Sequence, residues 1–277
     1  MVAIKQFIDR EPEMRTLEKE FEKETASFVI VYGRRRVGKT TLLSEFTKNK
    51  RTIYFLATQE SEAVNRKFFQ EKAAAVLQNE LLSSVVADKW DTIFKAIVSE
   101  SIREKIVVVI DEFQYLGKTN PAFPSVVQKI WDEHLKESNM MLILCGSLIS
   151  MMVSQTLAYS SPLYGRRTAQ IRLKQIPFRY YHEFCGDLPF KEQVERYAVT
   201  GGVPKYIESF SNSSDIYTSI VENIFDLSGY LYEEPYFLLQ QEVSEIGSYF
   251  SALRAIAYGN SKLADMASVI GVKATDL

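Results

Sequence analysis

The chain has 277 residues, 46% of them hydrophobic and 25% charged, which excludes a disordered or low-complexity protein and allows a large core. Its 33 Lys and Arg against 35 Asp and Glu give a formal charge of -2, which excludes a general polycation for nucleic acid or an anionic membrane. Two Cys and two His exclude a disulfide scaffold, a zinc ribbon and a multi-histidine metal centre. No apolar run has the length of a signal peptide or a membrane span, so we expect a cytoplasmic protein without a membrane partner.

Short runs of β-branched or aromatic residues recur through the first two thirds of the chain, separated by segments long enough for helices. They are Phe28–Tyr32, Thr52–Leu56, Ile106–Ile110, Met141–Cys145 and Gln170–Leu173. This alternation predicts an α/β fold with a doubly wound, mostly parallel sheet. After about Pro177 the pattern changes to short helices, and no Lys or Arg lies between Tyr206 and Leu253. This acidic segment is not expected to bind phosphates.

The strongest motif is GRRRVGKT, Gly33 to Thr40, which matches GxxxxGK[ST] between a strand-like and a helix-like segment. Such a loop turns its backbone amides toward phosphate oxygens, and the following helix adds partial positive charge at its N-terminus. Lys39 is expected to reach the β- and γ-phosphates, and the Thr40 hydroxyl to ligate Mg²⁺. A chance glycine turn is the alternative, and four constrained positions make it rare. The predicted nucleotide-binding residues here are Gly33, Arg34, Arg35, Arg36, Val37, Gly38, Lys39, Thr40 and Thr41, although the three arginines could contact phosphates, a partner or nothing.

A second motif, IVVVIDEF, is an apolar run that ends in two carboxylates, Asp111 and Glu112. Alone it is weak, because any buried strand can end in acidic residues. Together with the P-loop it predicts a Walker B strand, since ligands bind open α/β sheets at the carboxyl ends of the strands. Asp111 would then hold Mg²⁺, and Glu112 would polarise the water that attacks the γ-phosphate, which favours hydrolysis over binding alone.

Two further segments offer polar groups to the same chemistry. Ser147 follows the apolar run MLILCG, and its hydroxyl is a candidate to position the attacking water; the alternative is a simple Gly-Ser turn. Arg166 and Arg167 precede the last strand, where a guanidinium could act as an arginine finger, in cis or from a neighbouring subunit. Paired arginines on a surface are the alternative.

Six segments, in their order and spacing, resemble the archaeal and bacterial ATPase family of AAA+/STAND-like P-loop NTPases. They are FIDREPEM, VYGRRRVGKTTLL, VVIDEFQYL, LILCGS, SPLYGRRT and TGGVPKYI, and the resemblance spans residues 6 to 270. It implies ATP or ADP as the nucleotide, a P-loop strand between the sensor and Walker B strands, and a helical lid. It also implies that Phe7, Asp9 and Arg10 lie near the adenine and that Pro204 packs on the base. Taken alone, these residues fit an ordinary helix start and an ordinary turn.

Members of this family usually continue into a winged helix and a nuclease-like domain. The segments Tyr249–Tyr258 and Lys262–Ile270 fit the first two helices of a winged helix, and the chain stops before the recognition helix, so we expect a truncated piece or a broken gene. The expected domains are a P-loop ATPase domain at 1–176, a helical lid at 177–241 and a partial winged helix at 242–277. In the family pattern DNA would be bound through the missing part of the winged helix, so we expect this chain to bind DNA weakly.

The primary prediction is Mg²⁺-dependent ATP binding and hydrolysis coupled to motion of the lid. The alternative is a nucleotide-gated switch or DNA-associated regulator with negligible turnover. A hexameric DNA-processing motor is a third hypothesis, and it requires an oligomer with an arginine supplied in trans.

Overall fold

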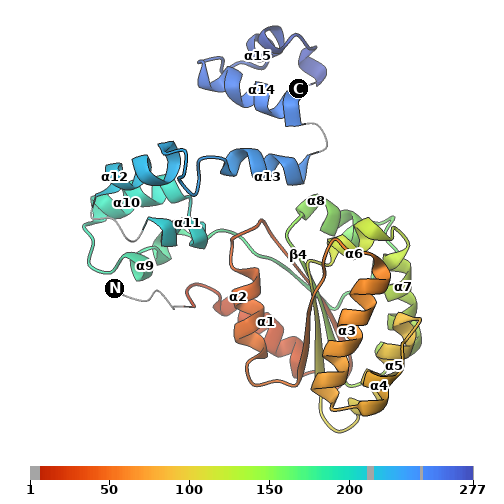
Figure 1. Ribbon diagram of the computed structural model, residues 1–277. Helices are drawn as coiled ribbons and strands as arrows, with labels where there is room; N and C mark the ends of the chain where they lie inside the picture. The colour runs from red at the N-terminus through yellow and green to blue at the C-terminus, as the bar shows by residue number, and fades with distance from the viewer. Residues whose placement is uncertain (1–6, 211–214, 244–245, 277) are drawn as a thin grey trace. The chain divides into compact units, whose positions relative to one another are not determined.

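The computed structural model describes residues 7–210, 215–243 and 246–276, and the chain divides into two compact units. Unit 1 runs from Met1 to Glu208 and unit 2 from Ser209 to Leu277. Figure 1 shows the chain coloured from its N-terminus to its C-terminus. The domain boundaries at 176 and 241 remain predictions.

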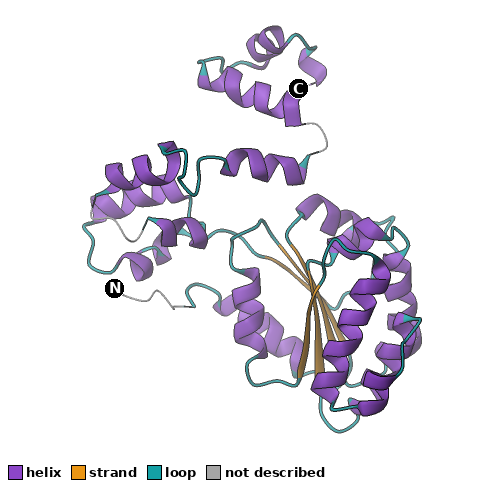
Figure 2. Ribbon diagram, in the orientation of Figure 1, coloured by secondary structure: helices purple, strands orange, loops and turns teal. Residues whose placement is uncertain are grey.

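Unit 1 is built on a parallel sheet, drawn in orange in Figure 2. Its five strands have the order β2-β3-β4-β1-β5. The strands are β1 (Ser27–Tyr32), β2 (Thr52–Leu56), β3 (Ile106–Asp111), β4 (Met140–Gly146) and β5 (Ala169–Arg172). All neighbouring strands are parallel, which confirms the predicted fold class and the five predicted strands within about one residue at each end.

The strand order implied by the family resemblance is wrong at one point. The P-loop strand β1 does not lie between the sensor and Walker B strands; β4 pairs with β1 on one side and with β3 on the other. The chain leaves β1 for the far edge of the sheet at β2 and then fills the gap with β3 and β4. The carboxyl end of β4 is therefore adjacent to those of both β1 and β3.

Helices cover both faces of the sheet, and alternate residues of each strand face opposite layers. In β1, Val29 and Val31 pack with Leu17 and Leu42, whereas Phe28 and Ile30 belong to the larger cluster on the other face. Both faces are buried, which explains why the strands read as nearly continuous apolar runs. The smaller cluster packs against α1 (Glu11–Phe21) and α2 (Lys39–Thr47). The larger one packs mainly against α3 (Glu62–Leu77), α5 (Trp90–Glu100), α7 (Phe123–Ile130) and the π-helical turn η1 (Trp131–Leu135).

Further helices complete unit 1. They are α4 (Glu80–Ser84), α6 (Gln114–Thr119), α8 (Ile149–Met152), η2 (Val153–Leu157), η3 (Phe178–Tyr180), α9 (His182–Cys185), α10 (Phe190–Thr200) and α11 (Pro204–Ser209), the last of which ends one residue into unit 2.

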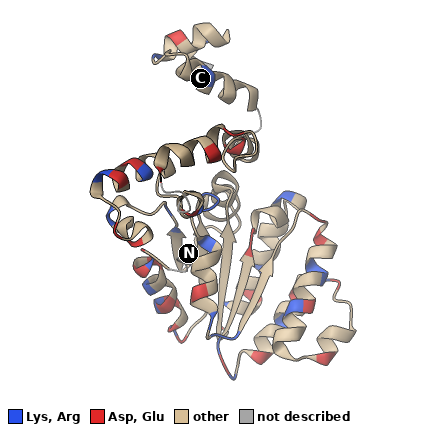
Figure 3. Cartoon of the chain, turned by 60° about the vertical axis from the view of Figure 1, so that its left-hand side comes forward, with Lys and Arg blue, Asp and Glu red and all other residues tan. Residues whose placement is uncertain are grey.

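The described part of unit 2 is helical. Its elements are α12 (Ile216–Ile220), η4 (Val221–Phe225), α13 (Glu234–Glu242), α14 (Ile246–Ala257), α15 (Leu263–Ile270) and η5 (Ala274–Asp276). The helices α14 and α15 confirm the two helices predicted there, and their assignment to a winged helix remains a prediction. Among the described residues no strand follows Arg172, as the change of pattern after Pro177 predicts. Figure 3 marks the charged residues of the described part of the chain.

No helix within the described ranges is both long and apolar enough to cross a membrane.

Candidate functional site at the carboxyl edge of the sheet

The P-loop connects the carboxyl end of β1 to the N-terminus of α2, and the backbone requires both of its glycines. A Cβ on Gly33 would lie 2.3 Å from the carbonyl oxygen of Leu173, because the chain after β5 passes directly over the loop. Gly38 has φ +93° and is the N-cap of α2, a conformation that favours glycine. The loop therefore presents the first turn of α2 to a ligand, as an anion-binding helix N-terminus does.

Lys39 is folded back over the P-loop. Its Nζ donates to the carbonyl oxygens of Gly33 at 2.8 Å and Arg34 at 2.9 Å, and the residue is buried. Burial lowers the pKa of Lys39, and the nearby Asp111 and Glu112 oppose this effect. The ammonium group of Lys39 thus lies inside the loop that is predicted to bind phosphate oxygens.

Asp111 ends β3 and lies beside the P-loop. Its Oδ2 accepts hydrogen bonds from the Thr40 hydroxyl at 3.2 Å and from the Tyr54 hydroxyl at 2.7 Å. Burial is the main effect that raises the pKa of Tyr54, and the negative charge of the neighbouring Asp111 raises it further. The Tyr54 hydroxyl therefore keeps its proton and remains a donor. The structure thus brings together Thr40 and Asp111, the two residues predicted to hold Mg²⁺, and adds Tyr54 from β2.

Glu112 follows directly, in the left-handed region with φ 53°. Its Oε2 accepts a hydrogen bond from the Ser147 hydroxyl at 2.7 Å and another from the side-chain amide of Gln114. Ser147 is buried and follows β4, whose carboxyl end is adjacent to β3. Asp111 and Glu112 at the end of β3 and Ser147 after β4 therefore lie together at the carboxyl edge of the sheet.

The three P-loop arginines have different surroundings. Arg34 is exposed, Arg35 donates to the Tyr115 hydroxyl at 2.8 Å, and the guanidinium of Arg36 lies 5.9 Å from the ring centre of Tyr206. Arg35 thus ties the P-loop to the segment that follows Glu112.

A cavity of about 410 Å³ opens beside the P-loop within unit 1. Among its lining residues are Thr41 of the P-loop segment and three residues that the family resemblance implies near the base, Phe7, Arg10 and Pro204. Arg10 is buried and donates to the carbonyl oxygens of Val37 and Lys174, each at 2.9 Å. Asp9, the remaining residue implied near the adenine, is buried but is not among the residues that line this cavity.

Arg166 and Arg167 lie at the opposite edge of the sheet. They precede β5, and Thr168 pairs with Phe28 near the start of β1, whereas the P-loop follows the end of β1. The six residues of β1 span about 20 Å at roughly 3.3 Å per residue. Arg166 is also bound through Nε and Nη2 to the carboxylate of Asp132, at 2.9 and 2.7 Å. This placement is incompatible with a finger acting in cis, and action on a neighbouring subunit remains a prediction.

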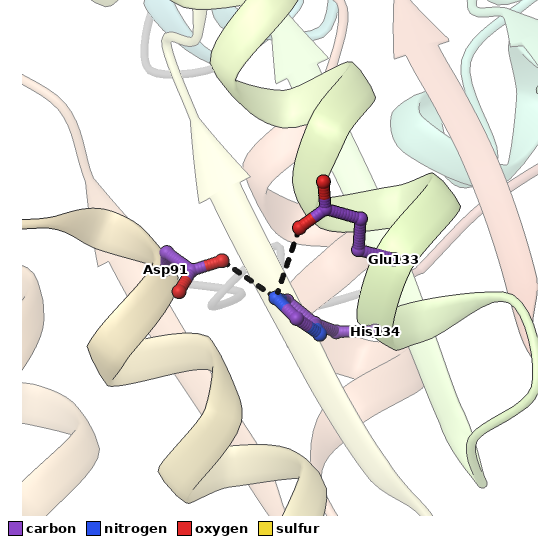
Figure 4. Close-up of side chains that lie close together, drawn as sticks. All are labelled: Asp91, Glu133 and His134. Carbon is purple, nitrogen blue, oxygen red and sulfur yellow. Dashed lines mark hydrogen bonds and ion pairs between the residues drawn. The ribbon is translucent and has the colours of Figure 1, made fainter.

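A separate cluster of ionisable side chains joins α5 to η1. His134 lies between two carboxylates, with its Nε2 2.5 Å from Asp91 Oδ1 and 3.8 Å from Glu133 Oε2 (Figure 4). The second oxygen of Asp91 is 2.8 Å from the ammonium of Lys95. Because Asp91 is already paired with two nitrogens, the cluster is best described as a polar contact between α5 and η1, with an ion pair between Asp91 and Lys95 inside α5.

Sequence reasoning missed Tyr54 and Gln114. Tyr54 reaches Asp111 from a neighbouring strand, so no local pattern marks it. Gln114 lies two residues after Glu112, and that proximity was an available signal.

Comparison with known proteins gives consistent matches. A family model described as an ATPase domain predominantly from Archaea matches residues 7–210. An uncharacterised protein of Methanocaldococcus jannaschii is 35% identical over 271 residues, which cover 98% of this chain and 58% of that protein, so the chain spans little more than half of this relative's length.

Solved structures share the fold at lower identity. The Walker-type ATPase of Pyrococcus abyssi has a TM-score of 0.71 at 20% identity, with 95% of this chain and 83% of that chain covered. The ORC1 protein of Aeropyrum pernix, solved in complex with DNA, has a TM-score of 0.50 at 12% identity, with coverage of 96% and 77%.

Proposed function

Because the chain belongs to the family of ATPase domains found predominantly in Archaea, we propose that it binds ATP with Mg²⁺ and hydrolyses it at the carboxyl edge of the sheet. The observation that supports this most directly is the position of Thr40, Asp111 and Glu112. The Thr40 hydroxyl lies 3.2 Å from the Asp111 carboxylate, and Glu112 follows Asp111 in the chain.

The phosphates are bound by the P-loop in this proposal. Lys39, which bonds to two carbonyl oxygens of its own loop, exchanges them for oxygens of the β- and γ-phosphates. The amides at the N-terminus of α2 supply further donors. The phosphate charge offsets the cost of burying the Lys39 ammonium.

The Thr40 hydroxyl and the Asp111 carboxylate offer oxygen atoms, which Mg²⁺ prefers, so these residues fit the ion. Bound Mg²⁺ would neutralise charge that develops on the phosphates. Tyr54 keeps the Asp111 carboxylate oriented through its bond to Oδ2. Thr40 and Asp111 are thus the proposed ligands of the ion, and Tyr54 orients Asp111.

Glu112 is the proposed general base. Its carboxylate accepts a proton from the attacking water, and the Ser147 hydroxyl fixes one of its oxygens at 2.7 Å. Ser147 is accordingly assigned to positioning in the hydrolytic step.

The cavity beside the P-loop is the proposed adenosine pocket. Phe7 and Pro204 provide apolar surface for the base, and Arg10 fixes the P-loop wall through the Val37 carbonyl. We further expect the nucleotide state to set the position of the helical segment 177–241. Competition between ATP and GTP for a fluorescent ATP analogue tests the base preference, and equal affinities would contradict it.

Steady-state phosphate release tests the proposed activity. Lys39→Ala is expected to lose nucleotide binding, and Glu112→Gln to retain binding while losing hydrolysis. Lys129→Ala and Glu80→Gln remove the same kinds of groups from exposed positions on other helices and serve as matched controls. If wild-type protein binds ATP but releases phosphate no faster than Glu112→Gln, the nucleotide-gated switch replaces the hydrolase.

DNA is a second proposed partner, and we expect these residues to bind it weakly. The segment between Tyr206 and Leu253 carries no Lys or Arg, so it offers no cation to the phosphate backbone. Fluorescence anisotropy with duplex DNA at physiological salt is expected to show no submicromolar binding. Such binding would require a basic surface elsewhere in the chain.

A further inference from the structure

The carboxylate of Glu112 is held by Gln114, a side chain to which the sequence motifs assign no role. We propose that Gln114 is a positioning residue for ATP hydrolysis, and that its buried amide fixes Glu112 with one carboxylate oxygen available to the attacking water. This inference rests on the proposed function, in which Glu112 is the base.

Glu112 needs support because of its backbone. Its φ of 53° is unusual for a residue other than glycine, and such a conformation persists only where surrounding contacts maintain it. Two backbone contacts flank it: the Glu112 amide donates to Asp111 Oδ1 at 2.9 Å, and the Phe113 amide donates to the Cys145 carbonyl at 2.9 Å. These two hydrogen bonds fix the backbone at Glu112, and the carboxylate of its side chain is oriented by other groups.

Gln114 supplies one of those groups. The residue is fully buried, and its Nε2 donates to Glu112 Oε2, the same oxygen that accepts from Ser147. The reverse amide orientation would bring two acceptor oxygens together, so the nitrogen belongs on this side. Because both donors use Oε2, and no described residue donates to Oε1, Oε1 is the oxygen left to accept a proton from water.

The surroundings of Gln114 indicate that a glutamine is specifically needed there. Its Oε1 is buried and accepts no hydrogen bond from any described residue, which is unfavourable in a packed interior. A Cβ on Gly146 would lie 2.2 Å from that oxygen, so the amide fits only because residue 146 is glycine. An apolar side chain of equal size would avoid the unsatisfied oxygen. The amide nitrogen on Glu112 is the contact that offsets this penalty.

The decisive experiment is a double-mutant cycle between Gln114→Met and Glu112→Gln, measured by phosphate release. Methionine keeps the length of the side chain and removes the donor. We expect Gln114→Met to lower kcat roughly 10- to 100-fold, as a misplaced catalytic group does, while KM and ADP affinity change less than twofold. In the Glu112→Gln background the same substitution is expected to have no further effect, because Gln114 acts through Glu112.

Gln155→Met is the matched control. Gln155 packs beside Gln114 and contacts its carbonyl oxygen at 3.4 Å, and no bond joins it to Glu112. It should retain wild-type kcat. If Gln114→Met does not fold, Gln114→Asn keeps the amide but shortens its reach by one methylene, and it should show the same loss of kcat.

An unchanged kcat in both Gln114 variants, or an equal loss in the presence and absence of the Glu112 carboxylate, would overturn the role of Gln114 alone. A wild-type rate no higher than that of Glu112→Gln would instead refute hydrolysis itself, and the positioning role with it.

Discussion

Tyr54→Phe removes a single oxygen from the candidate site and leaves the ring in place. In the structure that oxygen donates to Asp111 Oδ2 at 2.7 Å, and Asp111 is 3% exposed. A hydrogen bond to a charged group contributes about 1.5 to 3 kcal/mol. For a unit of this size each kcal/mol corresponds to roughly 2 to 4 °C in Tm, so unfolding should shift down by about 3 to 12 °C.

The functional effect of Tyr54→Phe should appear in the Mg²⁺ dependence of hydrolysis. Loss of a group that orients a metal-binding carboxylate typically costs about 10- to 100-fold in metal affinity. We expect the Mg²⁺ concentration for half-maximal phosphate release to rise by that order, with kcat at saturating Mg²⁺ nearly unchanged. Titration of Mg²⁺ at fixed ATP measures both quantities.

Tyr32→Phe is the control for this variant, because Tyr32 is also buried in the sheet and its hydroxyl bonds to no described side chain or backbone group. If Tyr54→Phe and Tyr32→Phe show the same Mg²⁺ dependence and the same Tm, the bond to Asp111 does not organise the site and the reasoning fails.

Three further predictions concern the P-loop and the arginine pair. Gly33→Ala places a Cβ 2.3 Å from the Leu173 carbonyl, and a shift of about 1 Å in the loop should weaken ATP binding roughly 100-fold; calorimetry showing wild-type affinity would contradict the close approach. Burial lowers the pKa of Lys39, and bound phosphate should raise it again. ADP affinity should therefore fall as pH rises above the lowered pKa of Lys39. Calorimetry in buffers of different ionisation enthalpy should detect the uptake of a proton on binding. If the affinity for ADP does not change with pH above the lowered pKa of Lys39, Lys39 is not the titrating group. Arg166→Ala breaks a partly exposed ion pair with Asp132 and should lower the free energy of unfolding by at most about 1 kcal/mol, as measured by chemical denaturation. The kcat of monomeric protein should not change. A lower kcat in the monomer would place Arg166 at the site of its own chain.

The sequence determined the features that depend on neighbouring residues. GRRRVGKT fixes the bend of the P-loop and the start of α2 within one short segment, and the apolar runs that end at Asp111 and Gly146 identify strands buried on both faces. The carboxyl edge of a parallel sheet then collects Thr40, Asp111 and Ser147, because every strand ends there.

Only the tertiary structure decided what depends on strand order and register. The position of β4 between β1 and β3, the reach of Tyr54 from β2, and the separation of Arg166 from the P-loop all follow from pairings between segments far apart in the chain. No local pattern encodes those pairings, because each strand alone is an apolar run that could occupy any central position in the sheet. The bond from Gln114 to Glu112 has a local signal, because the two residues are two positions apart, but its geometry depends on a left-handed backbone at Glu112 and on the room left by Gly146 on the adjacent strand.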